Sequence, residues 1–249
     1  MTAVRRTALV TGAGRNIGRA CVLELAGAGF NVVINGSKDR AACEAVAKEA
    51  ARAGVDSMVA MADIGDPKEC RRIADEAIKR FGAVDVLVNN AALRPAEPFL
   101  EMQEADWRRV LSVDLDAAVW LAQACLPGMM AKNWGRIVNF TGMNAIHGYA
   151  GRAPVSVAKH GAWGLTKALA KEFGPKGITT NAISPGPIAA DVESDAASMH
   201  HRQETMAKVP LGRMGTPAEL KGAIVFLASD ASSYMTGQNL VIDGGWTAW

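Results

Sequence analysis

The chain has 249 residues, of which 49% are hydrophobic and 21% are charged, and its formal net charge is +2. This length and composition predict one α/β domain, spanning residues 1–249, with a well-buried core. The small net charge argues against nucleic acid or an anionic membrane as a partner. The N-terminus enters a strand without an apolar signal core, and no stretch is apolar over the ~18 residues that a membrane helix needs. We therefore expect a cytoplasmic protein without a membrane partner.

Apolar runs alternate with helical patterns along the chain. In the first half we expect strands at 7–10, 31–35, 55–62 and 84–88, and helices at 17–28, 38–53 and 67–81. In the second half we expect strands at 136–141, 177–183 and 239–242, and helices at 104–131, 152–173 and 217–228. Strands that are apolar throughout and separated by helices predict a parallel sheet covered on both faces.

Residues 186–210 interrupt this alternation, because they are rich in Ala, Ser, Asp and Met and show weak periodicity. The segment is either a mobile lid or a plain surface excursion, and the pattern leaves both open.

The cysteines show no spacing typical of metal ligands, because none forms a CxxC pair and none lies near a histidine. They are Cys21, Cys43, Cys70 and Cys125. We expect buried or half-buried thiols in a reducing compartment, and no metal site.

A glycine-rich turn separates the first strand from the first helix. Six residues of this turn are expected to contact a ligand, namely Gly12, Gly14, Arg15, Asn16, Ile17 and Gly18. Residues without a Cβ let the backbone approach a pyrophosphate, and the helix N-terminus supplies free N–H groups and a partial positive charge. In this position the pattern predicts a dinucleotide site, against the alternative of a turn without a ligand.

The end of the second strand indicates which dinucleotide is bound. An acidic residue there would accept a hydrogen bond from the ribose 2′-hydroxyl and would repel a 2′-phosphate. Here no carboxylate occurs before Asp39, whereas Arg15, Ser37 and Lys38 offer two positive charges and a hydroxyl. NADP is therefore favoured over NAD, although both cations are also ordinary surface residues.

Further motifs extend along most of the chain, which resembles the short-chain dehydrogenase/reductase family and, within it, the 3-oxoacyl-carrier-protein reductases. The segments that carry the resemblance are Asp63-Ile64, Asn89-Asn90-Ala91-Ala92, Pro185-Gly186-Pro187-Ile188, Pro210-Leu211-Gly212-Arg213 and Gly237-Gln238 through Asp243-Gly244-Gly245. The resemblance implies a doubly wound, seven-stranded Rossmann-type sheet and a homotetramer. It also implies cofactor contacts from Asp63, Ile64, Asn90, Ala91, Lys159, Pro185, Gly186 and Ile188.

Most of this family's catalytic positions carry other residues in this sequence. Lys159 matches the lysine of the family's Tyr-x-x-x-Lys motif, but Val155 occupies the tyrosine position. Gly142 occupies the serine position, with Thr141 one residue earlier, and Asp114 occupies the asparagine position. Because valine neither donates nor accepts a proton, losing this general acid is expected to cost ~10²–10⁴-fold in rate. Ordinary ketone reduction by the family's usual route is therefore not expected.

Other groups offer substitutes for the missing acid. Val155 and Lys159, one helical turn apart, should both face the cleft, whereas Ser156 should miss it. His147 and Tyr149 lie in the segment that lines the substrate site in this family, and either is a proton donor or a residue that shapes the pocket. Lys159 is an acid or base if a dry pocket lowers its pKa, and otherwise only a ribose ligand. Asp114 either orients Lys159 or is a satisfied buried carboxylate.

Three functions fit these observations. The first is an NADP-dependent oxidoreductase that reduces a small organic substrate by an altered proton route. The second is a catalytically degenerate protein that binds a dinucleotide without turnover. The third is a lyase or hydratase on the same scaffold, with Lys159, His147 or Asp114 as base.

Overall fold

The computed structural model describes residues 5–189 and 206–248, and it contains one seven-stranded sheet in which each neighbouring pair is parallel. The strands are β1 (Thr7–Val10), β2 (Asn31–Gly36), β3 (Ser57–Met61), β4 (Val86–Asn89), β5 (Gly135–Phe140), β6 (Ile178–Pro185) and β7 (Asn239–Ile242). Their order across the sheet is β3-β2-β1-β4-β5-β6-β7. The predicted doubly wound parallel sheet is confirmed.

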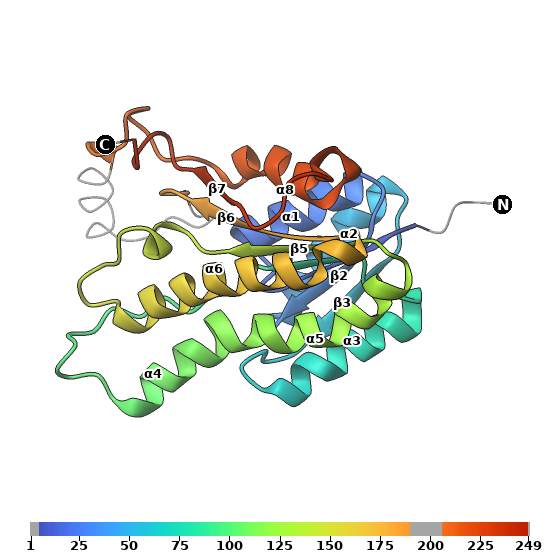
Figure 1. The fold of residues 1–249 in the computed structure, drawn as a ribbon, viewed down its shortest axis with the longest axis horizontal. Coiled ribbons are helices and arrows are strands. Elements are labelled where there is room, and N and C mark those ends of the chain that lie inside the picture. Colours follow the sequence, from blue (N-terminus) through green and yellow to red (C-terminus); the bar gives the residue numbers. More distant parts are fainter. Residues whose placement is uncertain (1–4, 190–205, 249) are drawn as a thin grey trace.

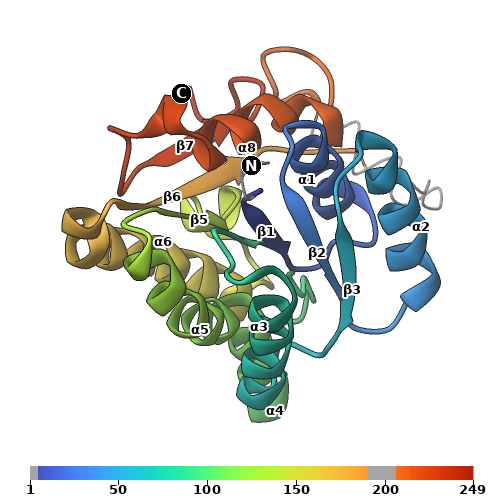
Figure 2. The ribbon, with the colours of Figure 1, turned by 90° about the vertical axis from the view of Figure 1, so that its right-hand side faces the viewer.

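Helices cover both faces of this sheet. They are α1 (Asn16–Gly27), α2 (Arg40–Ala50), α3 (Pro67–Phe81), α4 (Glu104–Leu111), α5 (Ala117–Ala131), α6 (Ala153–Phe173) and α8 (Lys221–Ala228). Figure 2 shows α1, α2 and α8 on one face, and α3, α4, α5 and α6 on the other.

The alternation of side chains along each strand builds a separate core on each face. In β1, Val10 packs into the core beneath α1, α2 and α8, whereas its neighbour Leu9 packs into the core beneath α3 and α5. β2 repeats the pattern, with Ile34 on the first side and Val33 on the second. Strands buried on both faces explain why these segments lack the polar alternation of a half-exposed strand.

Local sequence signals account for several helix boundaries. Asp39 caps α2 by accepting a hydrogen bond from the Ala42 amide at 2.9 Å. Asp66 caps α3 by accepting from the Lys68 amide at 2.8 Å, with Pro67 at the first helical position. The helix expected at 38–53 is shorter at both ends, because it starts after the Asp39 cap and its last residues form a separate 3₁₀ turn.

The expected helix at 104–131 contains an interruption. Between α4 and α5, Ser112–Asp116 forms a π-helical segment, which widens the helix by one residue per turn. By length and composition alone, Glu104–Ala131 is apolar enough to cross a membrane, because an 18-residue window in it has a mean hydropathy of 1.3. The expectation that no stretch of this length is apolar enough was therefore wrong. Half of that window is buried inside the protein, as in a helix that packs on a core sheet.

The strand order reverses between β1 and β4, which lie side by side with β2 on one side and β5 on the other. In parallel sheets ligands bind at such a switch point, just beyond the carboxyl ends of the strands. At this end of the molecule the segment after β4, the start of α6 and the C-terminal segment project together (Figure 1). Most of the segment discussed above as a lid, 190–205, lies outside the described residues.

Candidate active site

The glycine turn after β1 packs directly against the residues that follow β4. Gly12 has φ +62°, and a Cβ there would lie 2.8 Å from the Ala91 Cα. A Cβ on Gly18 would collide with the Gly12 carbonyl oxygen and would lie 2.7 Å from Asn90 Nδ2. Only glycine therefore fits at these two positions without moving the backbone.

Hydrogen bonds fix this turn to the end of β4. Thr11 Oγ1 accepts from the Asn90 amide at 3.0 Å and from the Ala91 amide at 3.1 Å. Asn90 Nδ2 donates to the carbonyls of Thr11 at 2.9 Å and Gly12 at 3.2 Å. Asn90 was expected to contact the cofactor. In the structure its side-chain amide binds the backbone of the glycine turn.

The α1 helix begins at the end of this turn without a side-chain cap. Arg15 is the N-cap residue and makes no capping hydrogen bond, and the first turn of the helix carries no acidic residue. Asn16 has φ +49°. The positive end of the α1 dipole is thus left without a neighbouring carboxylate from its own first turn.

Two cations flank the ends of β1 and β2. Arg15 and Lys38 are exposed, as is Ser37, and within residues 5–189 and 206–248 no carboxylate lies within 4 Å of either cation. Asn35, the buried residue near the end of β2, donates its side-chain amide to the carbonyls of Ala60 and Ala62 instead of facing solvent.

Asp63 follows β3 and is held by Arg109 from α4 at 2.8 Å. Desolvation raises the pKa of this carboxyl, but hydrogen bonds from the Gly65 amide and Arg109, with the charges of Arg109 and Lys38, outweigh it and lower the pKa. Its neighbour Ile64 is buried and lines the pocket described next.

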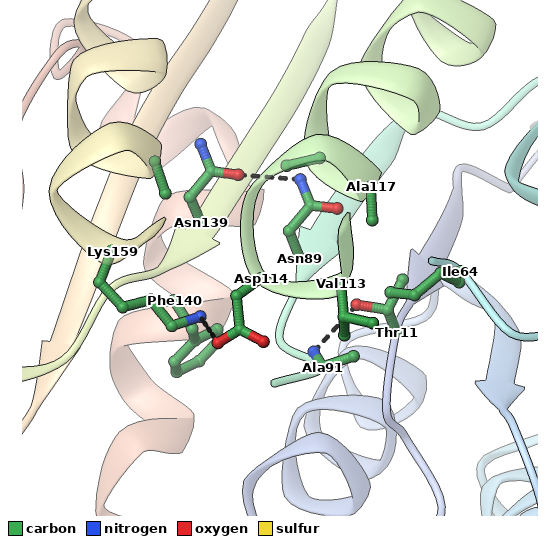
Figure 3. A pocket seen from close by; sticks show the side chains of 12 residues that line it. Thr11, Ile64, Asn89, Ala91, Val113, Asp114, Ala117, Asn139, Phe140 and Lys159 are labelled. Atoms are coloured by element: carbon green, nitrogen blue, oxygen red, sulfur yellow. Dashed lines mark hydrogen bonds and ion pairs between the residues drawn. The ribbon is translucent and has the colours of Figure 1, made fainter. Parts of the chain in front are cut away.

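A small pocket lies between β1, β4, β5 and the helices α5 and α6 (Figure 3). Its lining residues are Thr11, Ile64, Asn89, Ala91, Val113, Asp114, Ala117, Ala118, Asn139, Phe140, Lys159 and Ala162. The cavity measures about 10 Å³, which is roughly the room for one water molecule. Since Thr11 and Ala91 also belong to the glycine-turn contacts, the pocket is continuous with the turn.

Lys159 and Asp114 form a buried ion pair in this pocket, with 3.3 Å between Lys159 Nζ and Asp114 Oδ2. The other carboxylate oxygen of Asp114 accepts a hydrogen bond from the Leu93 amide at 2.7 Å. Lys159 and Asp114 are only 5% exposed each. Of the two interpretations for Asp114, the structure thus shows a direct pairing with Lys159.

Burial lowers the pKa of the Lys159 ammonium; the Asp114 carboxylate opposes this shift, and the positive charge of Arg94 adds to it. The position of Asp114 depends on the π-helical segment Ser112–Asp116, in which it is the central residue. Such segments commonly occur at functional sites, because the extra residue changes the direction of a side chain.

The backbone at the family's serine position differs from that of an ordinary serine. Gly142 has φ +69° and ψ −174°, a conformation reserved almost entirely for glycine. Thr141 does not replace the serine hydroxyl, because its buried Oγ1 is engaged by Ser184 Oγ at 2.8 Å and by the Ile183 carbonyl at 3.2 Å.

Val155 is fully buried and is absent from the residues that line the pocket. Val155 and Lys159 were expected to face the cleft together; of the two, only Lys159 lines this pocket. Ser156 was expected to miss the site, yet its hydroxyl contacts the substrate-lining segment by donating to Asn144 Oδ1 at 3.2 Å and accepting from the Tyr149 amide at 3.3 Å.

The two titratable side chains of that segment lie against the C-terminal region. The rings of His147 and Tyr149 are 6.5 and 6.4 Å from the ring of Trp246. His147 is exposed, whereas the hydroxyl of Tyr149 is buried without a hydrogen-bond partner in the part of the chain that the structure describes. Desolvation raises the pKa of Tyr149, and the positive charge of Arg152 opposes that shift.

The segment after β6 lies beside Gly142 and β7. The Gly186 amide donates to the Ile242 carbonyl at 2.9 Å, and a Cβ on Gly186 would lie 2.5 Å from Asp243 Cα. Pro185 is the nearest residue to a Cβ built on Gly142, at 3.8 Å, and Ile188 pairs with Gly215. The motif Pro185-Gly186-Pro187-Ile188 thus lies at the carboxyl end of β6.

Three residues of this region escaped the sequence analysis. Asn139 links β5 to β4 and α6 through Asn89 at 2.8 Å and Thr166 at 2.9 Å. Arg109 holds Asp63, and Arg94 influences the pair of Lys159 and Asp114. No spacing signal marks them, because each comes from a different element and meets its partner only in the folded sheet.

A family model described as "Enoyl-(Acyl carrier protein) reductase" matches residues 12–247. A 3-oxoacyl-[acyl-carrier-protein] reductase FabG of Staphylococcus aureus is 38% identical over 242 residues, covering 96% of this chain and 97% of the relative. The chain belongs to the short-chain dehydrogenase/reductase family. By family it is an oxidoreductase.

Other members of the short-chain dehydrogenase/reductase family differ in substrate. An L-rhamnose 1-dehydrogenase (NAD(P)(+)) of Azotobacter vinelandii is 37% identical over 250 residues, which is 98% of each chain. Acetoin dehydrogenase YohF of Salmonella typhimurium superposes with a TM-score of 0.90 at 32% identity, over 98% and 96% of the two chains. A provisionally assigned 2-deoxy-d-gluconate 3-dehydrogenase of Agrobacterium tumefaciens, solved with NADP, gives 0.89 at 34%, over 98% and 97%.

Proposed function

We propose that this protein is an NADP-dependent oxidoreductase that acts on a small organic substrate without the family's tyrosine and serine acid pair. The observation that carries the proposal is the buried pair of Lys159 and Asp114, which lies in a pocket continuous with the glycine turn. A cation with a lowered pKa beside the dinucleotide site is a proton source that survives the loss of the tyrosine.

The residues at the switch point suit a dinucleotide. The uncapped N-terminus of α1, with no acidic residue in its first turn, fits a pyrophosphate. Gly12, Gly14 and Gly18 carry no side chain, which leaves the backbone of the turn accessible at these positions. When bound, a nicotinamide dinucleotide supplies hydride exchange.

Further contacts to the dinucleotide are assigned by the family motifs. They are Asn16, Ile17, Asp63, Ile64, Asn90, Ala91, Pro185, Gly186 and Ile188, together with Lys159 of the buried pair.

The choice of NADP follows from charge at the end of β2. Arg15 and Lys38 have no carboxylate partner within 4 Å in the described part of the chain. Ser37, which directly follows β2, is exposed. A 2′-phosphate would satisfy both cations, whereas the ribose hydroxyl of NAD would leave them unpaired. The solved Agrobacterium tumefaciens relative with NADP is consistent with this choice.

The proton is assigned to Lys159. Its ammonium is held by Asp114, lies among buried groups and has its pKa lowered chiefly by that burial. The ammonium can give a proton to a substrate oxygen or nitrogen and recover it through the polar cavity lined by Asp114 and Asn89. With Asp114, Gly142 and Val155 at the positions of the family's asparagine, serine and tyrosine, the lysine would act without a phenol.

Calorimetric titration with NADPH and NADH, followed by measurement of NADPH oxidation over a panel of ketones, imines and enones, tests the proposal. We expect NADPH to bind at least tenfold more tightly than NADH and the preference to vanish in the variant with Arg15→Gln and Lys38→Gln. Lys159→Met should abolish turnover of whichever compound is reduced. Absence of binding to both nucleotides overturns the proposal, as does binding of NADPH without oxidation by any compound of the panel.

A further inference from the structure

Two arginines lie at the outer end of the site without an assigned role. Arg94 belongs to the segment after β4, and Arg152 is the N-cap residue of α6. Figure 1 shows that these two parts of the chain lie beside each other at the end of the sheet where the strands finish. Neither residue belongs to a motif of the glycine turn or to the pocket around Lys159.

Hydrogen bonds connect the segments of both arginines with each other and with Asp114. The Glu97 amide donates to the Gly151 carbonyl at 2.8 Å, which joins the segment of Arg94 to the loop that precedes Arg152. The amide of Leu93, the residue before Arg94, donates to Asp114 at 2.7 Å. The backbone on either side of the two arginines is therefore hydrogen-bonded, while the Arg94 side chain is exposed and that of Arg152 is partly buried.

The charges at this place are unbalanced. Desolvation lowers the pKa of Arg94; the Asp114 carboxylate opposes this shift and the Arg152 guanidinium adds to it. Arg94 in turn lowers the pKa of Lys159. In residues 5–189 and 206–248 no carboxylate lies within 4 Å of Arg94 or Arg152, and Asp114 is already paired with Lys159. Three cations thus share one carboxylate.

Two further observations point to a missing negative group. The 21-residue helix α6 begins directly after Arg152, with no side-chain cap and no acidic residue in its first turn, which adds the positive end of the helix dipole. The Tyr149 hydroxyl is buried, lacks a partner among the described residues and is within range of the Arg152 charge. A buried hydroxyl without a partner costs about 1–3 kcal/mol, and a ligand that accepts its hydrogen bond would remove that cost.

We propose that Arg94 and Arg152 bind an oxyanion, a carboxylate or a phosphate, carried by the substrate that is reduced beside Lys159. Guanidinium groups match the geometry of both anions with paired hydrogen bonds, and the phenol of Tyr149 is the additional donor. The substrate class is then a small oxo acid or an oxo phosphate. This inference rests on the proposed function, because it places the anion on the reducible compound.

The test is calorimetric titration of the protein saturated with NADP⁺, using matched pairs of compounds. The carboxylate arm compares 2-oxobutanoate, 3-oxobutanoate and 4-oxopentanoate with their methyl esters. The phosphate arm compares dihydroxyacetone phosphate with dihydroxyacetone. We expect at least one anion to bind at least tenfold more tightly than its neutral partner, and the arm in which this occurs identifies the group.

The variants Arg94→Gln and Arg152→Gln should each reduce that preference to about twofold or less, while their affinity for NADPH stays within about twofold of the original. Arg108→Gln is the matched control, because Arg108 is an exposed residue of α4 that pairs with Glu104, and it should keep the full preference. Arg94→Lys should restore part of the preference, because it keeps the charge but loses the paired geometry.

The outcomes separate the two proposals. Equal affinity for anions and neutral partners in the original protein overturns the anion site, even when NADPH is oxidised by the neutral compounds. Tenfold preference for an anion that survives both glutamine variants also overturns it. Preference that the variants abolish, in a protein that oxidises no NADPH, supports the anion site and overturns the proposed reduction instead.

Discussion

Asp114 stands at the position where the family's asparagine is expected, and this change places a carboxylate 3.3 Å from the Lys159 ammonium. A carboxylate raises the pKa of a neighbouring lysine, whereas burial lowers it. At this site burial dominates, so the pKa of Lys159 is lowered on balance.

We predict that Asp114→Asn lowers the pKa of Lys159 further, because it removes the one charge that favours the ammonium. The high-pH limb of kcat/KM for NADPH oxidation, where Lys159 loses its proton, should move to lower pH. The pH profile of the variant against that of Asp116→Asn, which alters the same helical segment without touching Lys159, is the measurement. An unmoved limb would show that Lys159 is not the titrating acid.

Gly142 carries the second residue-scale prediction. Its φ of +69° with ψ −174° is open to glycine and strained for other residues. Gly142→Ser, which adds the family's hydroxyl, should therefore lower the free energy of unfolding by about 1–3 kcal/mol. Urea unfolding measures this, and Gly142→Ala should lose a similar amount, since the strain comes from the backbone. A serine variant as stable as the original protein would show that the loop adapts freely.

At the scale of elements, the helices α2 and α3 begin where a short polar side chain binds a free amide. Asp66 accepts from the Lys68 amide at 2.8 Å and precedes Pro67, so the start of α3 is defined by two consecutive residues. The candidate active site also depends on one element, because the π-helical segment between α4 and α5 carries Asp114.

Asp66→Ala should destabilise the protein by about 1 kcal/mol, because the first turn of α3 loses its capping acceptor. Asp66→Asn keeps an oxygen in the same place and should retain most of the stability. The two variants are compared by urea unfolding, and nucleotide affinity should be unchanged in both, since α3 does not contribute a lining residue to the pocket of Lys159. Equal stability of the two variants would rule out the capping role.

At the scale of the whole molecule, we propose that single-domain subunits of 249 residues assemble into a homotetramer in the cytoplasm. Large hydrophobic side chains are exposed on the subunit, among them Phe99 at 69%, Leu100 at 96% and Val157 at 47%. Adjacent exposed apolar residues of this size are typical of surfaces that another subunit covers.

Light scattering after size-exclusion chromatography should give four times the mass of one chain. The double substitution Phe99→Ser and Leu100→Ser should reduce that mass if this segment lies in an interface. A single-chain mass for the original protein would contradict the tetramer and leave the fold unaffected.

The sequence determined the sheet and the dinucleotide turn, because both depend on local properties. Apolar runs separated by helical patterns were enough for seven parallel strands, and Gly12 and Gly18 were identifiable because no other residue fits a turn this close to Ala91. The spacing to Lys159 likewise predicts that Val155 stands where the family has its tyrosine.

Only the tertiary structure decided which side chains share the site. Lys159 and Asp114 are 45 positions apart and meet because a π-helical segment turns Asp114 toward α6. The segments that carry Arg94 and Arg152 are joined by a backbone hydrogen bond between Glu97 and Gly151. Burial of Val155, strain at Gly142 and the lowered pKa of Lys159 likewise depend on neighbours from distant segments, and periodicity along the chain carries no information about such contacts.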